Sequence, residues 1–485
     1  MSTKPSGGPA DGGRTAPSWE ALQGAIGGEV VLAGSPAYER LPAPFNARFD
    51  PLRPRAVVRC ASPEDAAETV AFARRHGLAL TMRSGGHDFA GRSSTDGVVL
   101  DLTPMASVTV ADGVARIGGG TRQGQVAETL RPEGVIVPGG TCPSVGVAGL
   151  TLGGGLGLMG RRHGLTADHL LAAQVVLADG RTVDCDDHHH PELFWALRGG
   201  GAGQLGAVTS LEFRPLPAPD ATNFRLVWPH AQAAAVIAAW QGWAPAAPDE
   251  LAASLVLAVP AEVDRPPVVT AFGVMLGGPS DATGLLEDLV DRAGAAPVTT
   301  VAEHLSYWRT LERWSRLDHA TSDPAGLAPP SPTPAHGYHV IRSEFFARPL
   351  PADAVAALVE LLVQGRADGQ ARELDFMPWG GAYNRVPAAA TAFVHRDQRF
   401  SLKHTATIDP SAPAAARQAA HRWADRSWSS VHPWGSGRVF PNFADPDLED
   451  WAEAYYGANL DRLRRVKARY DPDNVFRHGQ SLPVR

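Results

Sequence analysis

The chain has 485 residues, of which 44% are hydrophobic, and a formal net charge of −7 at pH 7. This length predicts two or three domains, and the composition is typical of a globular protein with a substantial core. Charges of both signs are spread along the chain without the basic stripe that nucleic-acid binding needs, and the longest apolar runs are too short to span a membrane.

Residues 1–18 are rich in glycine, proline and serine, so we expect a disordered lead-in. The segment lacks the apolar core of a secretory signal, which predicts a cytoplasmic protein. The three cysteines, Cys60, Cys142 and Cys185, are few and cannot all pair, so no disulfide framework is expected.

From about Arg55 to Pro215, short β-branched runs alternate with helices and glycine-rich turns. A helix is expected to begin after Ser62, a good N-cap residue, and to end at Gly77. The other elements predicted here are strands near 57–58, 78–82 and 98–102, a helix over 120–130, and a hairpin whose strands 175–178 and 181–183 flank Asp179 and Gly180.

Longer strands predominate between about Ala218 and Val431. Predicted strands span 252–259, 268–275, 339–346 and 400–408, and predicted helices span 353–362 and 413–430. This mixture predicts an α+β domain with an antiparallel sheet, and the proline-rich residues 327–334 are expected to form an exposed loop.

The chain from about His432 is predicted to be helical, with one helix from Asp445 to Tyr456 and another from Ala458 to Tyr470. Two interpretations of the polar tail beyond them stay open. It is either a loose end or a segment that returns to a site in the first domain.

Two glycine-rich motifs indicate a bound ligand, and the first is Arg83-Ser84-Gly85-Gly86-His87, directly after a predicted strand. Paired glycines let the backbone approach a diphosphate closely, and consecutive backbone N–H groups form an anion-binding nest. The motif is not the G-x-G-x-x-G of a dinucleotide-binding turn. The alternative interpretation is a glycine-rich turn with a surface histidine.

The second motif runs from Gly139 to Gly157 and holds Cys142 among many glycines. So many glycines cost folding entropy, and close approach of the backbone to a large flat ligand explains that cost. Apolar residues at regular intervals argue against a low-complexity linker. A lone cysteine is usually a small buried hydrophobe, but its place within this motif favours a functional role.

Together the two motifs resemble the FAD-binding domain of the vanillyl-alcohol-oxidase superfamily and, within it, the berberine-bridge-enzyme-like branch. That branch carries R-x-G-G-H and, some 55 residues later, G-x-C-x-x-V-G-V-x-G followed by G-G-G-x-G. Arg83–His87 and Gly140–Gly157 match these patterns at that separation. The resemblance continues over 160–168, 192–203 and the tail 455–481, and is looser in the middle, where 391–396 match best.

The resemblance implies an α+β protein with a two-domain PCMH-type FAD-binding fold. It assigns residues 19–217 to the FAD-binding domain, 218–431 to an antiparallel-sheet substrate domain, and 432–485 to a segment that completes the FAD domain. It implies FAD as the cofactor, bound through His87 to the flavin 8α-methyl and through Cys142 to flavin C6. The other cofactor-binding residues that it implies are Arg83, Ser84, Gly85, Gly86, Gly140, Thr141, Val145, Gly146, Gly149, Gly153, Gly154, Gly157, Gly206, Val208, Tyr456, Asn459, Asn474 and Gln480.

The resemblance also implies hydride transfer from an alcohol, amine, sugar or natural-product intermediate to flavin N5, with reoxidation by O₂ to H₂O₂. Val145 holds the place where a valine in this family accompanies oxygen access and a leucine opposes it, so an oxidase is favoured over a dehydrogenase. Oxidative cyclisation or another tailoring step in secondary metabolism stays open. The expected partners are a small-molecule substrate and O₂, the expected state is a monomer or homodimer, and no nucleic acid or membrane is expected.

The general base is harder to predict. Many family oxidases use a tyrosine in a Y-x-N-Y segment, but Phe440 and Phe443 hold both tyrosine positions here, and phenylalanine has no proton to exchange. The remaining candidates for the base are Tyr383, as first choice, and Asp375, His395 and His404. The candidates for stacking on a sugar or polycycle are Trp379, Trp428 and Trp434.

Two alternatives belong to other classes. One is a reductase with noncovalent FAD, against which His87 and Cys142 argue. The other is a flavin-carrying binding protein without turnover, which the missing tyrosines keep open.

Overall fold

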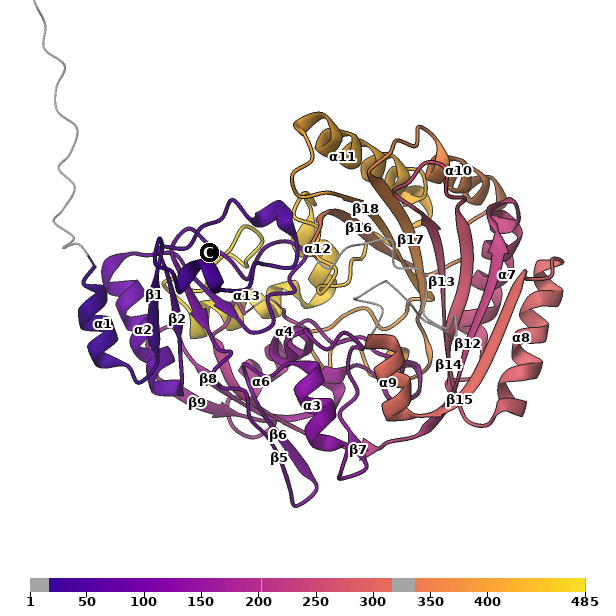
Figure 1. Cartoon of the computed structure of the whole chain (residues 1–485). Helices are drawn as coiled ribbons and strands as arrows, with labels where there is room; N and C mark the ends of the chain where they lie inside the picture. Colours follow the sequence, from indigo (N-terminus) through magenta and orange to yellow (C-terminus); the bar gives the residue numbers. More distant parts are fainter. Residues whose placement is uncertain (1–16, 202, 316–335, 485) are drawn as a thin grey trace, which may run out of the picture.

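The computed structural model describes residues 17–201, 203–315 and 336–484, so most of the predicted lead-in and the whole predicted loop at 327–334 lie outside the described residues. The chain folds into two domains, one built on two smaller sheets and the other on one large sheet (Figure 1). Helices and antiparallel sheets occur in both, which confirms the predicted α+β class.

The first sheet has four strands in the order β1 (Glu29–Leu32), β2 (Ala56–Arg59), β4 (Val98–Asp101) and β3 (Leu80–Arg83), and β4 is parallel to both of its neighbours. Between β2 and β3 in the chain, α2 (Pro63–His76) forms as predicted. The Ser62 hydroxyl accepts the Asp65 N–H at 3.3 Å, and Gly77 ends the helix at a φ of 62°. α1 (Trp19–Ala25) packs on α2 and has no counterpart among the predicted elements.

The second sheet is antiparallel, in the order β5 (Val108–Ala111), β6 (Val114–Gly118), β10 (Ala207–Phe213), β8 (Leu170–Val176) and β9 (Thr182–Cys185). The predicted hairpin is confirmed, but residues 177–181 connect its strands, so the expected two-residue turn is wrong. The neighbouring elements are α3 (Gln123–Leu130), β7 (Val135–Ile136), α4 (Val147–Leu152), α5 (Gly160–His163), α6 (Pro191–Leu197) and β11 (Leu216–Pro217).

The third sheet has seven strands, all antiparallel to their neighbours. Their order is β15 (Thr299–Ser306), β12 (Asp220–Pro229), β14 (Val268–Leu276), β13 (Leu251–Val259), β17 (Gln370–Pro378), β18 (Phe400–Ile408) and β16 (Tyr338–Phe346). One face packs against α7 (Ala233–Trp243), α8 (Pro279–Ala293), α10 (Ala352–Val363) and α11 (Ala414–Ser429), as Figure 1 shows. The opposite face turns toward the first domain.

The four strands and two helices predicted for this domain are confirmed to within a few residues. Side chains of β18 alternate as a half-buried strand requires: Phe400 and Leu402 enter the helix-covered core, whereas Lys403 faces the first domain. The elements without a sequence-based prediction are β12, β15, β17, α7, α8 and α9 (Tyr307–Ser315).

The C-terminal segment begins its helices later than predicted. α12 (Trp451–Tyr456) starts after Asp450, so the expected helix start at Asp445 is wrong. α13 (Leu460–Tyr470) forms close to its predicted span. The tail then returns to the first sheet, where Phe476 pairs with Leu80 of β3. Of the two interpretations of the tail, the structure supports the return to the first domain.

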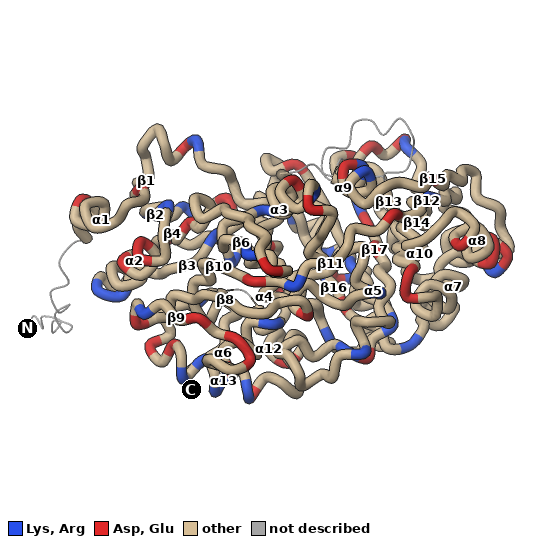
Figure 2. The backbone as a smooth tube through the Cα atoms, turned by 90° about the horizontal axis from the view of Figure 1, so that it is seen from below, with Lys and Arg blue, Asp and Glu red and all other residues tan. Residues whose placement is uncertain are grey.

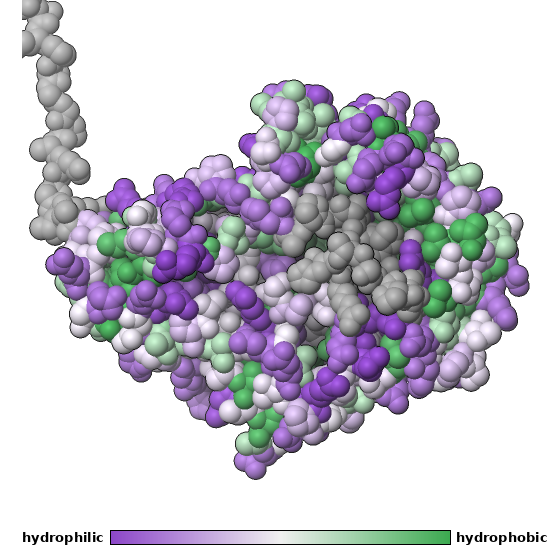
Figure 3. Space-filling view, in the orientation of Figure 1, coloured by the Kyte–Doolittle hydropathy of each residue, from purple (hydrophilic) through white to green (hydrophobic). Residues whose placement is uncertain are grey.

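The described surface mixes charges of both signs, and Figure 2 shows acidic and basic residues interspersed along the backbone. Hydrophobic residues form scattered patches on the face shown in Figure 3. No helix within the described ranges combines the length and the hydropathy needed to cross a membrane.

Candidate active site

A cavity of about 540 Å³ lies between the two glycine-rich motifs and the face of the seven-stranded sheet that is turned toward the first domain. We call it the central cavity. Its volume falls within the range of small-molecule and cofactor sites. Aromatic and aliphatic side chains make up much of its wall, including Phe45, Phe89, Phe272, Trp314 and Met377. The cavity therefore suits a large ligand with apolar surface.

The two glycine motifs touch through their backbones. A Cβ atom on Gly85 would lie 2.2 Å from the Gly146 nitrogen, and one on Gly146 would lie 2.3 Å from the Gly85 nitrogen. Only glycine at both positions allows this contact, because real Cβ atoms do not approach so closely. The contact brings His87 and Cys142, which are 55 residues apart in the sequence, to the wall of the same cavity.

His87 is held on two sides. Its Nε2 lies 2.8 Å from the Ser144 hydroxyl oxygen, and its ring stacks on Phe45 with 4.6 Å between the ring centroids. Gly86, directly before it, has a φ of 73°, which favours glycine. The imidazole therefore has a defined orientation at the cavity wall.

The wall has further features of a cofactor cradle. A Cβ atom on Gly157 would lie 1.8 Å from the Gly139 carbonyl oxygen, whereas Gly149 borders open space at the end of α4 that faces the cavity. The buried Ser84 hydroxyl has no hydrogen-bond partner among the described residues. Bare backbone and an unsatisfied hydroxyl are what a bound flavin nucleotide would use. The residues present thus fit FAD.

Most residues predicted to bind the cofactor line the central cavity. These are Ser84, Gly85, Gly86, His87, Gly140, Thr141, Cys142, Val145, Gly146, Gly149, Gly157, Gly206 and Val208. Arg83, Gly153 and Gly154 do not. The Arg83 side chain donates to the Ser93 carbonyl at 3.0 Å, and the two glycines make room for Asn442 and Phe393.

The four polar tail residues predicted to close the site also lie away from the cavity wall. Tyr456 accepts a hydrogen bond from Gln204 at 2.9 Å, and Asn459 donates to the Ala388 carbonyl at 2.8 Å. Gln480 donates to a backbone carbonyl at 2.6 Å, and Asn474 adopts a φ of 51° in the turn after α13. These contacts fasten the tail to the rest of the protein.

The part of the C-terminal segment that does reach the cavity is Phe440, Asn442 and Phe443. Asn442 donates to the Leu150 carbonyl at 2.8 Å, and the Phe443 ring lies 5.8 Å from that of Phe89. The stretch matched to the family's tyrosine segment therefore does border the cavity. It contributes two rings without hydroxyl groups.

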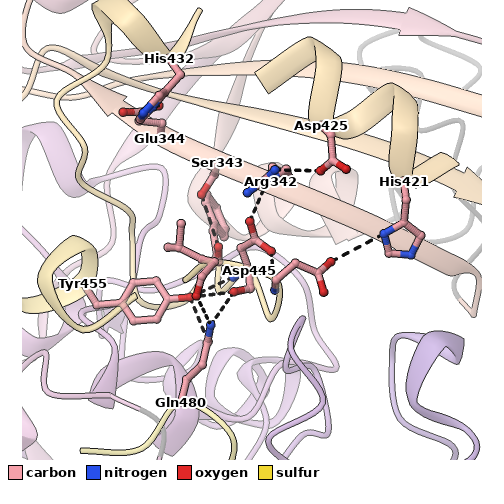
Figure 4. A network of polar contacts seen from close by, with 12 residues as sticks. Arg342, Ser343, Glu344, His421, Asp425, His432, Asp445, Tyr455 and Gln480 are labelled. Carbon is pink, nitrogen blue, oxygen red and sulfur yellow. Dashed lines mark hydrogen bonds and ion pairs between the residues drawn. The ribbon is translucent and has the colours of Figure 1, made fainter. Parts of the chain in front are cut away.

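A polar network holds this stretch in place (Figure 4). The Asp445 carboxylate pairs with Arg342 of β16 at 2.9 Å, and its backbone carbonyl accepts from Gln480. The Tyr455 hydroxyl accepts the Asp445 N–H at 3.0 Å. Asp445 thus links the large sheet to the tail. These contacts explain why it is buried although it does not cap a helix.

Charged groups line the cavity on both sides: Asp88, Arg92 and Arg161 belong to the first domain, and a second group lies on the large sheet. Lys403 of β18 places its Nζ 3.0 Å from Asp375 and 3.7 Å from Glu373, both on β17. Burial alone would lower the pKa of Lys403, but the two carboxylates outweigh it and raise that pKa. Burial also raises the pKa of Glu373, against the attraction of Lys403. Among the candidate bases, Asp375 lines the cavity and has Lys403 as its charged partner.

Tyr383 lines the cavity, but its environment opposes the predicted role as a base. Its hydroxyl donates to the Gly157 carbonyl at 3.3 Å, and its ring stacks on Trp379 at 4.3 Å. Burial raises its pKa. The ring also fills the space that the absent side chain of Gly160 leaves. These contacts are those of a packing residue.

The two predicted histidines do not line the cavity. His395 bonds to the Tyr455 carbonyl at 3.0 Å, and burial lowers its pKa to about 3. His404 is turned to the helix side of β18, where it bonds to Ser427 at 2.8 Å, and burial lowers its pKa to about 3 as well. Both therefore stay neutral and out of reach of a ligand in the cavity.

Three tryptophans considered for substrate stacking are likewise elsewhere. Trp379 and Trp434 pack in hydrophobic clusters, and Trp428 lies under the guanidinium of Arg342 at 4.2 Å. The tryptophan that lines the cavity is Trp314, 5.4 Å from the ring of Phe272. Nothing in the sequence distinguishes it, because it stands on a short amphipathic helix like a core residue.

Comparison with known proteins agrees with this site. Residues 54–186 match the model of an FAD binding domain, and residues 439–483 match the model described as berberine and berberine like. The FAD-linked oxidoreductase YgaK of Bacillus subtilis is 32% identical over 470 residues, which cover 94% of this chain and 97% of YgaK. The chain belongs to the berberine-like family of FAD-linked oxidoreductases.

Solved structures place this oxidoreductase in the same fold. Wild-type BBE-like 1 of Physcomitrella patens superposes with a TM-score of 0.84 at 25% identity, covering 96% of this chain and 99% of that one. A glucooligosaccharide oxidase from Acremonium strictum, described with a 6-S-cysteinyl, 8α-N1-histidyl FAD, superposes with a TM-score of 0.83 at 27% identity, covering 96% and 98%. The predicted PCMH-type fold and the use of FAD are therefore confirmed.

Proposed function

We propose that this oxidoreductase is an oxidase whose FAD is attached twice, from His87 to the 8α carbon and from Cys142 to C6. The observation that carries the proposal is the Gly85–Gly146 contact, which brings both residues to one cavity. The relative described with a cysteinyl, histidyl FAD supports it, since the same two residue types stand here in the matching motifs.

Bound FAD would accept a hydride from a substrate carbon and pass the electrons to O₂, which gives H₂O₂. The protein then has to position the substrate and take up the proton of its hydroxyl or amine group. Much of the cavity wall beyond the glycine motifs is aromatic and aliphatic, and the large sheet adds the charged cluster on β17 and β18. An alcohol or amine of a sugar unit or a natural-product intermediate fits this pattern, and a tailoring oxidation in secondary metabolism is our preferred role.

Asp375 is our choice for the proton acceptor. One of its oxygens pairs with Lys403 at 3.0 Å, and the other is buried without a hydrogen-bond partner among the described residues. An unsatisfied buried carboxylate oxygen is costly, and a substrate O–H or N–H would satisfy it. Lys403 holds the other oxygen of Asp375 and so fixes the orientation of the carboxylate toward the cavity.

Val145 supports O₂ as the electron acceptor. It lines the central cavity three residues after Cys142, and its backbone N–H donates to the Cys142 carbonyl at 3.3 Å. This turn keeps the small Val145 side chain beside the proposed attachment point. A bulkier side chain there would occupy the space that O₂ needs.

The activity can be tested with a screen of sugars, polycyclic alcohols and amines, coupled to peroxide detection, under air and with an artificial acceptor without O₂. The proposal predicts flavin that stays with the protein after acid precipitation and a substrate oxidised at least as fast with O₂ as with the dye. Faster turnover with the dye by orders of magnitude would identify a dehydrogenase. A yellow pellet without turnover on any substrate would favour a flavin-carrying binding protein.

A further inference from the structure

Ser144 belongs to the Cys142 motif but contacts the residue of the other motif. Its Oγ lies 2.8 Å from Nε2 of His87. The backbones enforce this approach, because a Cβ atom on Gly85 would lie 2.7 Å from the Ser144 carbonyl oxygen. The side-chain contact and the backbone contact therefore occur at the same point, and both depend on the close approach of the two motifs.

The face of the imidazole is fixed independently of Ser144. The Phe45 ring stacks on His87 at a tilt of 24°, and the Phe45 N–H donates to the Gly86 carbonyl at 3.0 Å. Phe45 also stacks on His339, with 5.0 Å between centroids. Phe45 thus sets the plane of the ring, and Ser144 contacts its Nε2 atom. The second ring nitrogen, Nδ1, lies on the other side of the ring from this contact.

We propose that Ser144 is the positioning residue for attachment of FAD to His87: its hydroxyl holds Nε2, so that Nδ1 forms the bond to the 8α carbon. This inference rests on the proposed function, because it concerns one of the two bonds that function assumes. It adds a role for a residue that is neither an attachment point nor part of the glycine cradle.

The hydroxyl suits both ends of the reaction. Before the bond forms, the Ser144 oxygen accepts a hydrogen bond from the Nε2–H group. In this tautomer the lone pair that reacts is on Nδ1. Nδ1 then bonds to the 8α carbon, one 8α hydrogen leaves as a proton, and the Nε2 proton leaves as well. The electron pair of the broken C–H bond reduces the flavin, and O₂ takes this pair with the two protons to give H₂O₂.

In the product, Nε2 carries no proton and needs a donor. A hydroxyl can accept first and donate afterwards, so the same 2.8 Å contact serves His87 before and after attachment. A backbone carbonyl in this position could only accept. This difference explains why a hydroxyl-bearing side chain, rather than main chain, meets Nε2.

The test uses the fact that trypsin separates the two motifs. Cleavage after Arg83 and Arg92 releases residues 84–92 with His87, and cleavage after Arg122 and Arg161 releases residues 123–161 with Cys142. A doubly attached FAD joins the two peptides. Mass spectrometry of digests from the purified holoprotein then measures the His87 bond by the fraction of 84–92 that is released alone, with the Cys142 bond as internal control.

Ser144→Thr and Ser144→Val form the matched pair, because threonine and valine have the same shape and differ in the hydroxyl. We expect the threonine variant to give joined peptides as the parent does. In samples digested at the same early time after expression, we expect the valine variant, and Ser144→Ala, to release a larger fraction of 84–92 alone with flavin still on 123–161. Loss of a hydrogen bond to a developing charge slows attachment by about tenfold.

Equal joining in the threonine and valine variants would overturn the inference, as would loss of flavin from both peptides in the valine variant, which would show that Ser144 acts on FAD binding. A parent digest without flavin on either peptide would instead overturn the proposed function. Peptides joined equally in the parent and in the valine variant would overturn the role of Ser144 but leave the double attachment standing. The two failures are therefore distinguishable.

Discussion

Replacing Gly146 by alanine would drive apart the loops that carry His87 and Cys142. The added Cβ would lie 2.3 Å from the Gly85 nitrogen and 2.4 Å from the Ser84 hydroxyl oxygen, whereas ordinary contact begins at 3.4 Å. The Gly146 backbone itself has a φ of −72°, which alanine adopts without strain. The effect of the substitution is therefore purely steric, and the loops must separate by about 1 Å to relieve it.

That displacement has two consequences of known size. Overpacking a close contact costs about 1–3 kcal/mol of folding free energy. A shift of about 1 Å between reacting groups slows bond formation by about a hundredfold. We therefore expect Gly146→Ala to fold with reduced stability and to carry FAD on one residue at most, because both attachment points can no longer meet one flavin.

The assay is mass spectrometry of the denatured variant, with thermal unfolding of the same sample. Gly284→Ala is the matched control, since Gly284 lies within α8 and an added Cβ there meets nothing within 4 Å. This control should keep both bonds and gain up to about 1 kcal/mol of stability from the better helix former. Full double attachment in Gly146→Ala at parental stability would show that the Gly85–Gly146 contact does not set the positions of His87 and Cys142.

Three further predictions follow from the site and the buried histidines. Asp375→Asn keeps the shape of the side chain but removes its capacity as a base, so turnover should fall by about a hundredfold or more while FAD stays attached; unchanged turnover would assign the proton to another group. Val145→Leu should slow reoxidation of the reduced flavin by O₂ more than reduction by substrate, as stopped-flow absorbance under each condition would show, and an equal effect on both steps would contradict a role in oxygen access. Burial lowers the pKa of His339 to about 4 and those of His395 and His404 to about 3, below the value of about 6.5 in an unfolded chain. The unfolded state therefore binds protons that the folded state does not, and each histidine should cost about 2 kcal/mol of stability between pH 7 and pH 5. Urea unfolding at the two pH values measures this loss, which equal stability would contradict.

Local chemistry made much of the first domain predictable. The Ser62 cap, the Gly77 stop and the alternating apolar residues act over a few positions, so the helix and strands between them could be inferred without tertiary information. The glycine motifs were informative for a similar reason. Their backbone contact explains why so many glycines stand there, and most of them do line the central cavity.

The charged cluster shows where such inference ends. β17 carries Arg372, Glu373 and Asp375, which hide the apolar alternation of a strand. Glu373 and Asp375 face the cavity, where the site needs charged side chains. The site therefore masks the alternation of apolar and polar residues by which a strand is predicted. Lys403 is 28 residues further along the chain, and only the β17–β18 register, which pairs it with Asp375, brings the charges together.

The polar residues of the tail mark a second limit. Asn459 and Gln480 have the side chains expected of ligand contacts, yet both satisfy backbone carbonyls instead. An amide side chain serves either purpose equally well. Its partner depends on how the tail docks, which no local pattern specifies.

In the proposed enzyme, one FAD is bonded to both His87 and Cys142. The most direct measurement is the mass of the denatured protein for the parent, His87→Ala, Cys142→Ala and the double variant. We expect covalent FAD in the parent and in each single variant, with the remaining bond mapped to the residue left unchanged, and none in the double variant. A parent that releases its FAD on denaturation, or a double variant that retains it, would rule out attachment through these two residues.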